Sequence, residues 1–159
     1  MLTLQQDDLK EVVQKLLDSL EILFALKHAN VTLYATEREY FAEIDALHVE
    51  GVLKNLLDNS LKYGNENPLI SISLHQNEQE VLVWVSDNGP GIPEEYFTKI
   101  FEKFFRIPSG NKHPVKGYGL GLSYAALIMQ QHGGSIEVKN NKPKPGCTFI
   151  LHFKKNNAA

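Results

Sequence analysis

Two asparagines and a lysine recur at helical spacing in one segment of the 159-residue chain. At about 100° per residue, Asn55, Asn59 and Lys62 fall on one face of a helix, with Tyr63 at its edge. An amide oxygen can coordinate a hard cation such as Mg²⁺, and a lysine ammonium can neutralise a phosphate. This face therefore suits an anionic ligand bound together with a metal ion, although an ordinary solvated face would show the same polarity.

A first glycine segment follows directly on an apolar strand and reads Asp-Asn-Gly-Pro-Gly-Ile-Pro over residues 87–93. The carboxylate of Asp87 could accept a hydrogen bond from an amino group such as the exocyclic amine of adenine. Gly89 and Gly91 would let the backbone approach a flat ring closely. The alternative is a plain turn, for which Asn, Gly and Pro are the usual residues.

A second glycine segment, residues 117–123, reads Gly-Tyr-Gly-Leu-Gly-Leu-Ser and leads into a predicted helix. Free backbone N–H groups at a helix N-terminus bind phosphate. The glycine spacing matches neither the dinucleotide-binding fingerprint nor the P-loop. A flexible hinge is the alternative interpretation.

Between the glycine segments, Phe101, Phe104 and Phe105 recur at i, i+3 and i+4. This spacing predicts a helical turn whose aromatic face packs on the core. Arg106 follows beside the polar stretch, where its guanidinium could reach a terminal phosphate.

Placing these residues together requires helices and strands from the whole chain. Periodicity and capping signals predict helices over 7–27, 45–63 and 119–131 and strands over 30–34, 40–44, 69–75, 80–87, 135–139 and 147–153. The long Gly-, Pro- and Lys-rich stretch over about 88–116 is predicted to be a lid. We expect an α+β fold: a two-layer α/β sandwich with a mixed, mostly antiparallel sheet of about five strands and three main helices on one face.

Composition narrows the class of protein further. Apolar residues make up 43% of the chain and charged residues 22%, which excludes collagen-like and low-complexity sequences. The single cysteine, Cys147, excludes an internal disulfide and a multi-cysteine zinc site. The net charge of −3 shows no excess of basic residues of the kind that binds nucleic acid. No apolar run is long enough to span a membrane. We expect one soluble, cytoplasmic domain over residues 1–159.

Taken in order, the four segments resemble the four boxes of the catalytic and ATP-binding domain of sensor histidine kinases. That domain belongs to the ATPase superfamily shared with gyrase, Hsp90 and the mismatch-repair clamp. Residues 55–63 (Asn-Leu-Leu-Asp-Asn-Ser-Leu-Lys-Tyr) resemble the asparagine box and 87–91 the first glycine box. Residues 101–106 resemble the phenylalanine box and 117–123 the second glycine box.

The resemblance implies ATP and Mg²⁺ as the bound molecules, and it assigns each box a role. Asn59 would hold the metal, Asn55 and Lys62 would contact phosphates or metal, and Arg106 would meet the γ-phosphate. Asp87 would read adenine. The implied nucleotide-contacting residues are Asn59, Tyr63, Asp87, Gly89, Gly91, Ile92, Gly117, Gly119, Leu120, Gly121 and Leu122.

Gyrase-like relatives carry a glutamate as general base for water, four residues before the metal-binding asparagine. Here that position is Asn55, whose amide cannot take a proton. The resemblance therefore favours transfer of the phosphoryl group to a protein acceptor over efficient hydrolysis. A serine kinase of the anti-sigma type, a clamp ATPase and a non-catalytic nucleotide-binding module stay open as alternatives.

The phosphoacceptor expected in this family is a histidine on a helical hairpin, typically followed by an acid. None of the six histidines precedes Asp or Glu, and His48, on the face of Asn55 and Asn59, is either near the nucleotide or simply exposed. We therefore expect an excised catalytic domain, monomeric when isolated and without membrane contact of its own. The acceptor hairpin would belong to a homodimeric parent, which could be an inner-membrane sensor, and a response regulator would act downstream.

Overall fold

Five strands form one mixed sheet in the computed structural model, which describes residues 1–108 and 121–156. The strand order is β2-β4-β5-β7-β6, in which β2 runs parallel to β4 and the other neighbours are antiparallel. These strands are β2 (Asn30–Tyr34), β4 (Leu69–Gln76), β5 (Glu80–Asp87), β6 (Ser135–Asn140) and β7 (Cys147–Lys154). A two-stranded antiparallel sheet joins β1 (Gln5–Asp8) to β3 (Phe41–Ile44).

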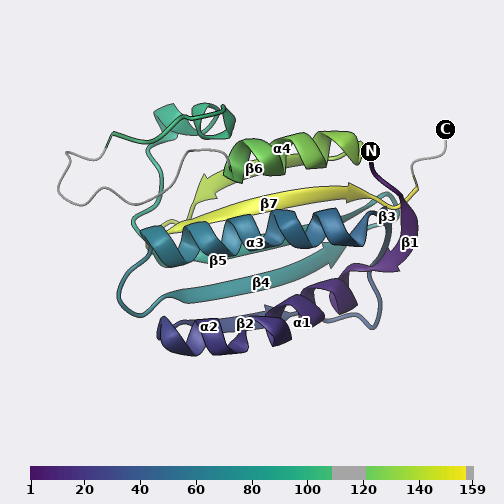
Figure 1. Cartoon of the computed structure of the whole chain (residues 1–159), viewed down its shortest axis with the longest axis horizontal. Helices are drawn as coiled ribbons and strands as arrows, with labels where there is room; N and C mark the ends of the chain where they lie inside the picture. Colours follow the sequence, from purple (N-terminus) through teal and green to yellow (C-terminus); the bar gives the residue numbers. More distant parts are fainter. Residues whose placement is uncertain (109–120, 157–159) are drawn as a thin grey trace.

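The helices form a single layer over one face of the five-stranded sheet (Figure 1). They are α1 (Leu9–Ser19), α2 (Glu21–Leu26), α3 (Ala46–Tyr63) and α4 (Gly121–Gln131), and two short 3₁₀ helices, η1 (Glu94–Tyr96) and η2 (Lys99–Phe101), follow β5. In Figure 1, α3 lies between α4 on one side and α1 with α2 on the other. The predicted fold class, a mixed five-stranded sheet with three main helices on one face, is confirmed.

Helix α3 begins and ends where its capping residues predict. The Asp45 carboxylate accepts a hydrogen bond from the backbone N–H of His48, which satisfies one of the free donors of the first turn. The helix ends at Gly64. Its buried side chains recur at three- and four-residue spacing and face the sheet: Val49, Val52, Leu53, Leu56, Leu57 and Ser60.

The first predicted helix, over 7–27, is wrong in two respects. Residues 5–8 are a strand, because Gln5 to Asp8 pair with β3 and the Asp8 side chain caps the helix that starts at Leu9. The helix is also interrupted at Leu20, which separates α1 from α2. The apolar periodicity runs unbroken past Leu20 and gives no sign of the break there, and the polar residues Gln5 to Asp8 show no alternation that would indicate a strand.

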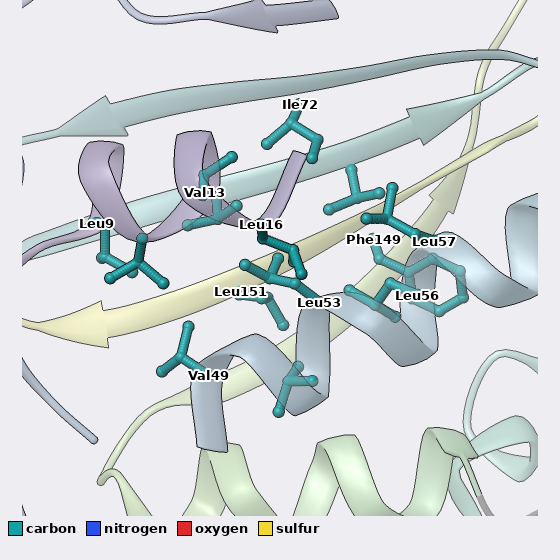
Figure 2. Packing of buried hydrophobic residues seen from close by; sticks show 14 of the residues in the cluster. Leu9, Val13, Leu16, Val49, Leu53, Leu56, Leu57, Ile72, Phe149 and Leu151 are labelled. Carbon is teal, nitrogen blue, oxygen red and sulfur yellow. The ribbon is translucent and has the colours of Figure 1, made fainter. Parts of the chain in front are cut away.

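The core lies between the helix layer and the inner face of the sheet (Figure 2). Leucines of α1 and α3 meet alternate residues of the strands, among them Ile72 and Phe149. Burying one such side chain stabilises the fold by about 1.5–3 kcal/mol, before conformational entropy is subtracted. This core fixes α3 over the sheet and so determines which residues α3 presents at its ends.

Three segments that carry predicted site residues meet the β6–β7 connection at one end of the sheet. The C-terminal end of α3, the end of β5, the β6–β7 connection and the start of α4 all lie there in Figure 1. The chain start and the end of β7 lie at the opposite end.

Candidate functional site

Asp87 is the last residue of β5, and its carboxylate is held by three strong donors from three parts of the chain. Its Oδ1 accepts from the backbone N–H of Gly89 at 2.9 Å and from that of Cys147 at 3.3 Å. Its Oδ2 accepts from the Ser60 hydroxyl of α3 at 3.0 Å. Two carboxylate oxygens offer about four acceptor positions, and the fourth is met only by the weakly donating Cys147 thiol, 3.9 Å from Oδ2, which a stronger donor such as an amino group could replace.

Glycines surround this carboxylate because side chains would overlap its neighbours. A Cβ at Gly146 would overlap the Asp87 carbonyl, and Gly146 has a φ of +95°, which side-chain-bearing residues rarely adopt. A Cβ at Gly89 would lie 3.3 Å from Asp87 Oδ1. The close approach of the two loops to Asp87 thus depends on both glycines.

The loop that carries Gly91 and Ile92 is fixed to the end of β6. The Asn140 side chain accepts from the Ile92 N–H at 2.9 Å and donates to the Ile92 carbonyl at 2.7 Å. Gly91 has a φ of +79°, and a Cβ there would lie 2.9 Å from Asn140 Oδ1. Asn140 therefore pairs with the loop as a neighbouring strand would, and holds it against the sheet.

The polar face of α3 has the composition that the sequence predicts. Asn55 and Asn59 are half-buried, and Tyr63 is 47% exposed. The Lys62 ammonium lies 3.1 Å from the Asp58 carboxylate one turn earlier. A bound phosphate would either share the ammonium with Asp58 or replace Asp58 as its partner. A hollow of about 230 Å³ between α2 and α3 borders Asn55.

Helices α3 and α4 approach closely through small residues at the site. A Cβ on Gly121 would lie 3.0 Å from Asn55 Oδ1, which brings the asparagine segment against the start of α4. Leu122 is half-buried beside it. Gly117, Gly119 and Leu120 lie outside the described residues.

The phenylalanine segment is only partly as predicted. Phe101 packs edge-on against Phe149, and Phe105 contacts Tyr96 at 5.5 Å between ring centroids. Phe104, however, is 68% exposed and has a φ of +65°. The chain leaves the 3₁₀ helix η2 after Phe101, so the i, i+3, i+4 spacing does not gather the three rings on one face. Arg106 lies on the surface.

His48 lies at the far end of α3 from Asn59. Its ring Nδ1 is 3.1 Å from the Asp45 carboxylate, the group that caps the helix. Backbone hydrogen bonds from Thr3 chiefly, together with His48, lower the pKa of Asp45 to about 2, against a smaller opposing effect of burial. His48 is thus half-buried at the helix cap and not simply exposed.

The match to a known family covers most of the chain. Residues 44–157 match the family described as histidine kinase-, DNA gyrase B-, and HSP90-like ATPase. The chain belongs to this ATPase family. The predicted resemblance is confirmed, and the part of the chain that matches contains the four segments that carry it.

Relatives of this ATPase domain are sensor proteins. RprX of Bacteroides fragilis (strain YCH46) is 32% identical over 154 residues, 94% of this chain and 29% of RprX. SrrB of Staphylococcus aureus (strain NCTC 8325 / PS 47) is 32% identical over 153 residues, 92% of this chain and 26% of SrrB. The chain therefore spans less than a third of either sensor protein.

Solved structures of histidine kinases have the same fold as this domain. The catalytic domain of histidine kinase ThkA matches with a TM-score of 0.84 and 29% identity, over 97% of this chain and 99% of that domain. ThkA in complex with the response regulator protein TrrA matches with a TM-score of 0.81 and 27% identity, over 96% of this chain and 42% of that chain. This ATPase domain therefore has the sequence and fold of a sensor histidine kinase catalytic domain.

Two classes of site find no support within residues 1–108 and 121–156. No group of three or more His, Cys, Asp or Glu side chains there could hold a metal ion. No helix in those ranges is long and apolar enough to cross a membrane.

Several residues around Asp87 were missed by sequence reasoning. Ser60 lies among leucines on the buried face of α3, and its polarity there is the one signal that the sequence offers. Asn140, Gly146 and Cys147 belong to the β6–β7 hairpin, whose contact with Asp87 depends on strand order and not on a local motif. Burial, and then the Asp87 charge, raise the pKa of the Cys147 thiol to about 12, so it stays protonated and can donate weakly to Asp87.

Proposed function

We propose that this domain binds Mg²⁺-ATP and transfers the γ-phosphoryl group to a histidine on a separate helical hairpin. It would act as the catalytic part of a two-component sensor kinase. The observation that carries the proposal is the Asp87 carboxylate, held by Ser60, Gly89 and Cys147 at the same end of the sheet as the asparagine face of α3.

Adenine recognition is assigned to Asp87 and the glycine loops. Three of about four acceptor positions are filled by N–H and O–H donors, and the exocyclic amine of adenine would take the position that the weakly donating Cys147 thiol faces. Guanine presents a carbonyl oxygen at the corresponding place, which would face the carboxylate without a hydrogen bond. Gly89 and Gly91 leave the backbone close to the ring, and Ile92, fixed by Asn140, would cover one face.

Phosphate and metal binding are assigned to α3 and the start of α4. The amide oxygen of Asn59 would hold Mg²⁺, which neutralises phosphate charge when bound. Asn55 and Lys62 would contact the phosphates, with Lys62 exchanging Asp58 for a phosphate oxygen. Gly121 and Leu122, with Gly117, Gly119 and Leu120, would bring backbone N–H groups to the phosphates. Arg106 would bind the γ-phosphate.

In the proposed step, an imidazole nitrogen of the acceptor attacks the γ-phosphorus, the bond to the β-phosphate oxygen breaks, and ADP leaves. Lys62 and Arg106 would stabilise the charge that develops on the transferring group. Asn55 has no basic group with which to deprotonate water, so hydrolysis would lack a general base. A neutral imidazole needs no such base, because its nitrogen lone pair is free to attack.

The proposed partners are the acceptor hairpin and a downstream response regulator. A complex between ThkA and its response regulator supports the second partner by analogy. The relatives are sensor proteins more than three times as long as this chain, which supports a longer parent. We propose that this parent is a homodimer.

The test is phosphotransfer from γ-labelled Mg²⁺-ATP to a panel of purified histidine-bearing helical hairpins. We expect acid-labile, alkali-stable label on at least one hairpin, and loss of that label when the acceptor histidine is replaced by glutamine. Rapid steady-state hydrolysis without transfer would instead indicate a clamp ATPase. Acid-stable label on serine would indicate an anti-sigma-type kinase, and tight ATP binding without either reaction would indicate a binding module.

A further inference from the structure

The outer face of the sheet, opposite the helices, contains a hollow of about 460 Å³. Strand register explains it, because Ser71, Ser86 and Thr148 lie side by side across β4, β5 and β7 with small side chains. Trp84 stands in the next row and forms one wall. The β6–β7 connection, residues 141–146, forms the other wall. The Asp87 carboxylate points to the helix side of the sheet, toward Ser60, so this hollow is separate from the proposed nucleotide site.

The walls of the hollow are fixed by a network of polar side chains. Asn141 Nδ2 donates to the Ser86 hydroxyl at 3.1 Å, and the Thr148 hydroxyl donates to Asn141 Oδ1 at 2.6 Å. A hydrogen bond of 2.9 Å joins the Ser86 and Thr148 hydroxyls and closes the ring. Because Thr148 is also buried, the connection is held in one place against β5 and β7.

Three lysines line this hollow, although the chain as a whole has a net charge of −3. Lys142 pairs with Glu94 at 3.3 Å, and no acidic partner of Lys139 or Lys144 is found among the described residues. The Lys139 ammonium lies over the Trp84 ring instead, 4.3 Å from the ring centroid. Two positive charges thus converge on the hollow without a counter-charge from the described part of the chain.

The indole of Trp84 adds a donor that lacks an acceptor. Its Nε1–H is shielded from solvent and makes no hydrogen bond within the described part of the chain. A buried donor without a partner is unfavourable, and an incoming acceptor would relieve that cost.

We propose that this hollow is a binding site for a small oxyanion that carries two or more negative charges, on phosphate or carboxylate groups. Its volume lies in the range of small-molecule sites, about 300–1,000 Å³. Lys139 and Lys144 supply the charge. The Ser71 and Ser73 hydroxyls of β4 line the hollow and supply donors beside them. The ligand is recognised on the sheet's outer face, independently of ATP.

Trp84 is the only tryptophan in the chain, so its fluorescence reports directly on this hollow. The experiment titrates pyrophosphate and, separately, citrate into the protein at about 150 mM NaCl, where the Debye length is about 8 Å and diffuse attraction is screened. We expect a saturable change with at least one of these probes. Pyrophosphate alone would indicate a phosphate ligand, and citrate alone a carboxylate ligand.

Charge-removing variants distinguish this site from general charge effects. Lys144→Gln, which leaves the Trp84 ring untouched, should weaken binding by about tenfold, and Lys139→Gln, followed by calorimetry, should do the same. The matched control, Lys15→Gln with Lys27→Gln, removes two charges on the helix side of the sheet and should leave binding unchanged. Unaltered thermal unfolding would establish that each variant is folded.

Three results would overturn the proposal. The first is a fluorescence change that NaCl reproduces at equal ionic strength. The second is binding that survives the Lys139→Gln, Lys144→Gln double variant. The third is binding that is lost in Asn59→Ala but kept in the double variant, since the probe would then occupy the phosphate region proposed for ATP.

Discussion

At the scale of single residues, Asp87 is where three distant segments meet. Ser60, Gly89 and Cys147 each donate to its carboxylate, and the remaining acceptor position is met only by the weakly donating Cys147 thiol. In Asp87→Asn, an amide nitrogen would take the place of one oxygen and would face the adenine amine donor to donor. We expect ATP affinity measured by calorimetry to fall by about 10–100-fold.

The matched control for this change is Glu94→Gln, which makes the same replacement at an exposed residue near the same end of the sheet. Glu94 pairs with Lys142 and has no proposed contact with ATP, so its variant should bind ATP as the parent does. If Asp87→Asn bound ATP as tightly as the parent and still rejected GTP, the adenine role of Asp87 would be wrong.

Asn59 provides a second test at this scale, because its proposed role depends on the metal. Asn59→Ala should lower ATP affinity at least tenfold in the presence of Mg²⁺ and leave it near the parent value in EDTA. Asn67→Ala is the control, since Asn67 is an exposed asparagine after α3 whose side chain makes no hydrogen bond to any described residue. Calorimetry with and without Mg²⁺ measures both. Equal losses in the two conditions would show that Asn59 acts on structure or on the nucleotide itself.

At the scale of elements, the contact between α3 and α4 positions the asparagine face beside the start of α4. Gly51 in α3 faces Tyr124 of α4, and a Cβ there would lie 2.8 Å from the Tyr124 hydroxyl oxygen but 3.4 and 3.5 Å from the nearest ring carbons. The hydroxyl is therefore the atom that an alanine side chain at position 51 would crowd. The helices approach as closely as this one atom allows.

A double-mutant cycle tests that contact. Gly51→Ala gains about 0.8–1 kcal/mol of helix propensity, which the contact with the Tyr124 hydroxyl should largely cancel. In the Tyr124→Phe background the same change should raise the free energy of unfolding by nearly the full amount. Urea denaturation of the four proteins measures the difference. An identical effect of Gly51→Ala in both backgrounds would show that the hydroxyl does not limit the approach of α3 and α4.

Elements with local signals were predictable, and contacts between distant elements were not. Helix α3 followed from its leucine periodicity and from Asp45, both of which act within a few residues. Strand β1 did not, because its Gln5 and Gln6 carry no strand preference and its partner β3 begins at Phe41. The same distinction holds at the site. Asn59 and the glycine motifs could be read from spacing, whereas the donors to Asp87 from Ser60 and Cys147 depend on how the strands are ordered.

At the scale of the whole molecule, His132 joins segments at the end of the fold opposite the proposed nucleotide site. It is only 1% exposed, follows α4, and packs edge-on against Phe153 of β7. The backbone N–H of Asp45 lies 3.1 Å from Nε2, and the Ile128 carbonyl lies 2.8 Å from Nδ1. Both contacts are satisfied only by the neutral ring, with Nε2 accepting and Nδ1–H donating.

This arrangement predicts how stability depends on pH. Burial lowers the pKa of His132 below its ordinary value of 6.5, although its hydrogen bond to Ile128 and the nearby Asp45 charge oppose the shift. The unfolded chain therefore takes up a proton as the pH falls through about 6.5, before the folded chain does. The free energy of unfolding should be highest above that pH and should decline below it. Urea denaturation at a series of pH values from 8 to 5 measures this dependence.

His132→Gln removes the titration while keeping an acceptor for Asp45 and a donor for Ile128. It should flatten the decline between pH 6.5 and pH 5, whereas the control His28→Gln, at an exposed histidine, should retain it. The lowered pKa of Asp45, about 2, adds a separate loss only below about pH 4, because that carboxylate stays charged above it. The two effects therefore occupy different pH ranges. An unchanged slope in His132→Gln would mean that another group makes stability fall with acid, and that His132 joins α3, α4 and β7 by packing alone.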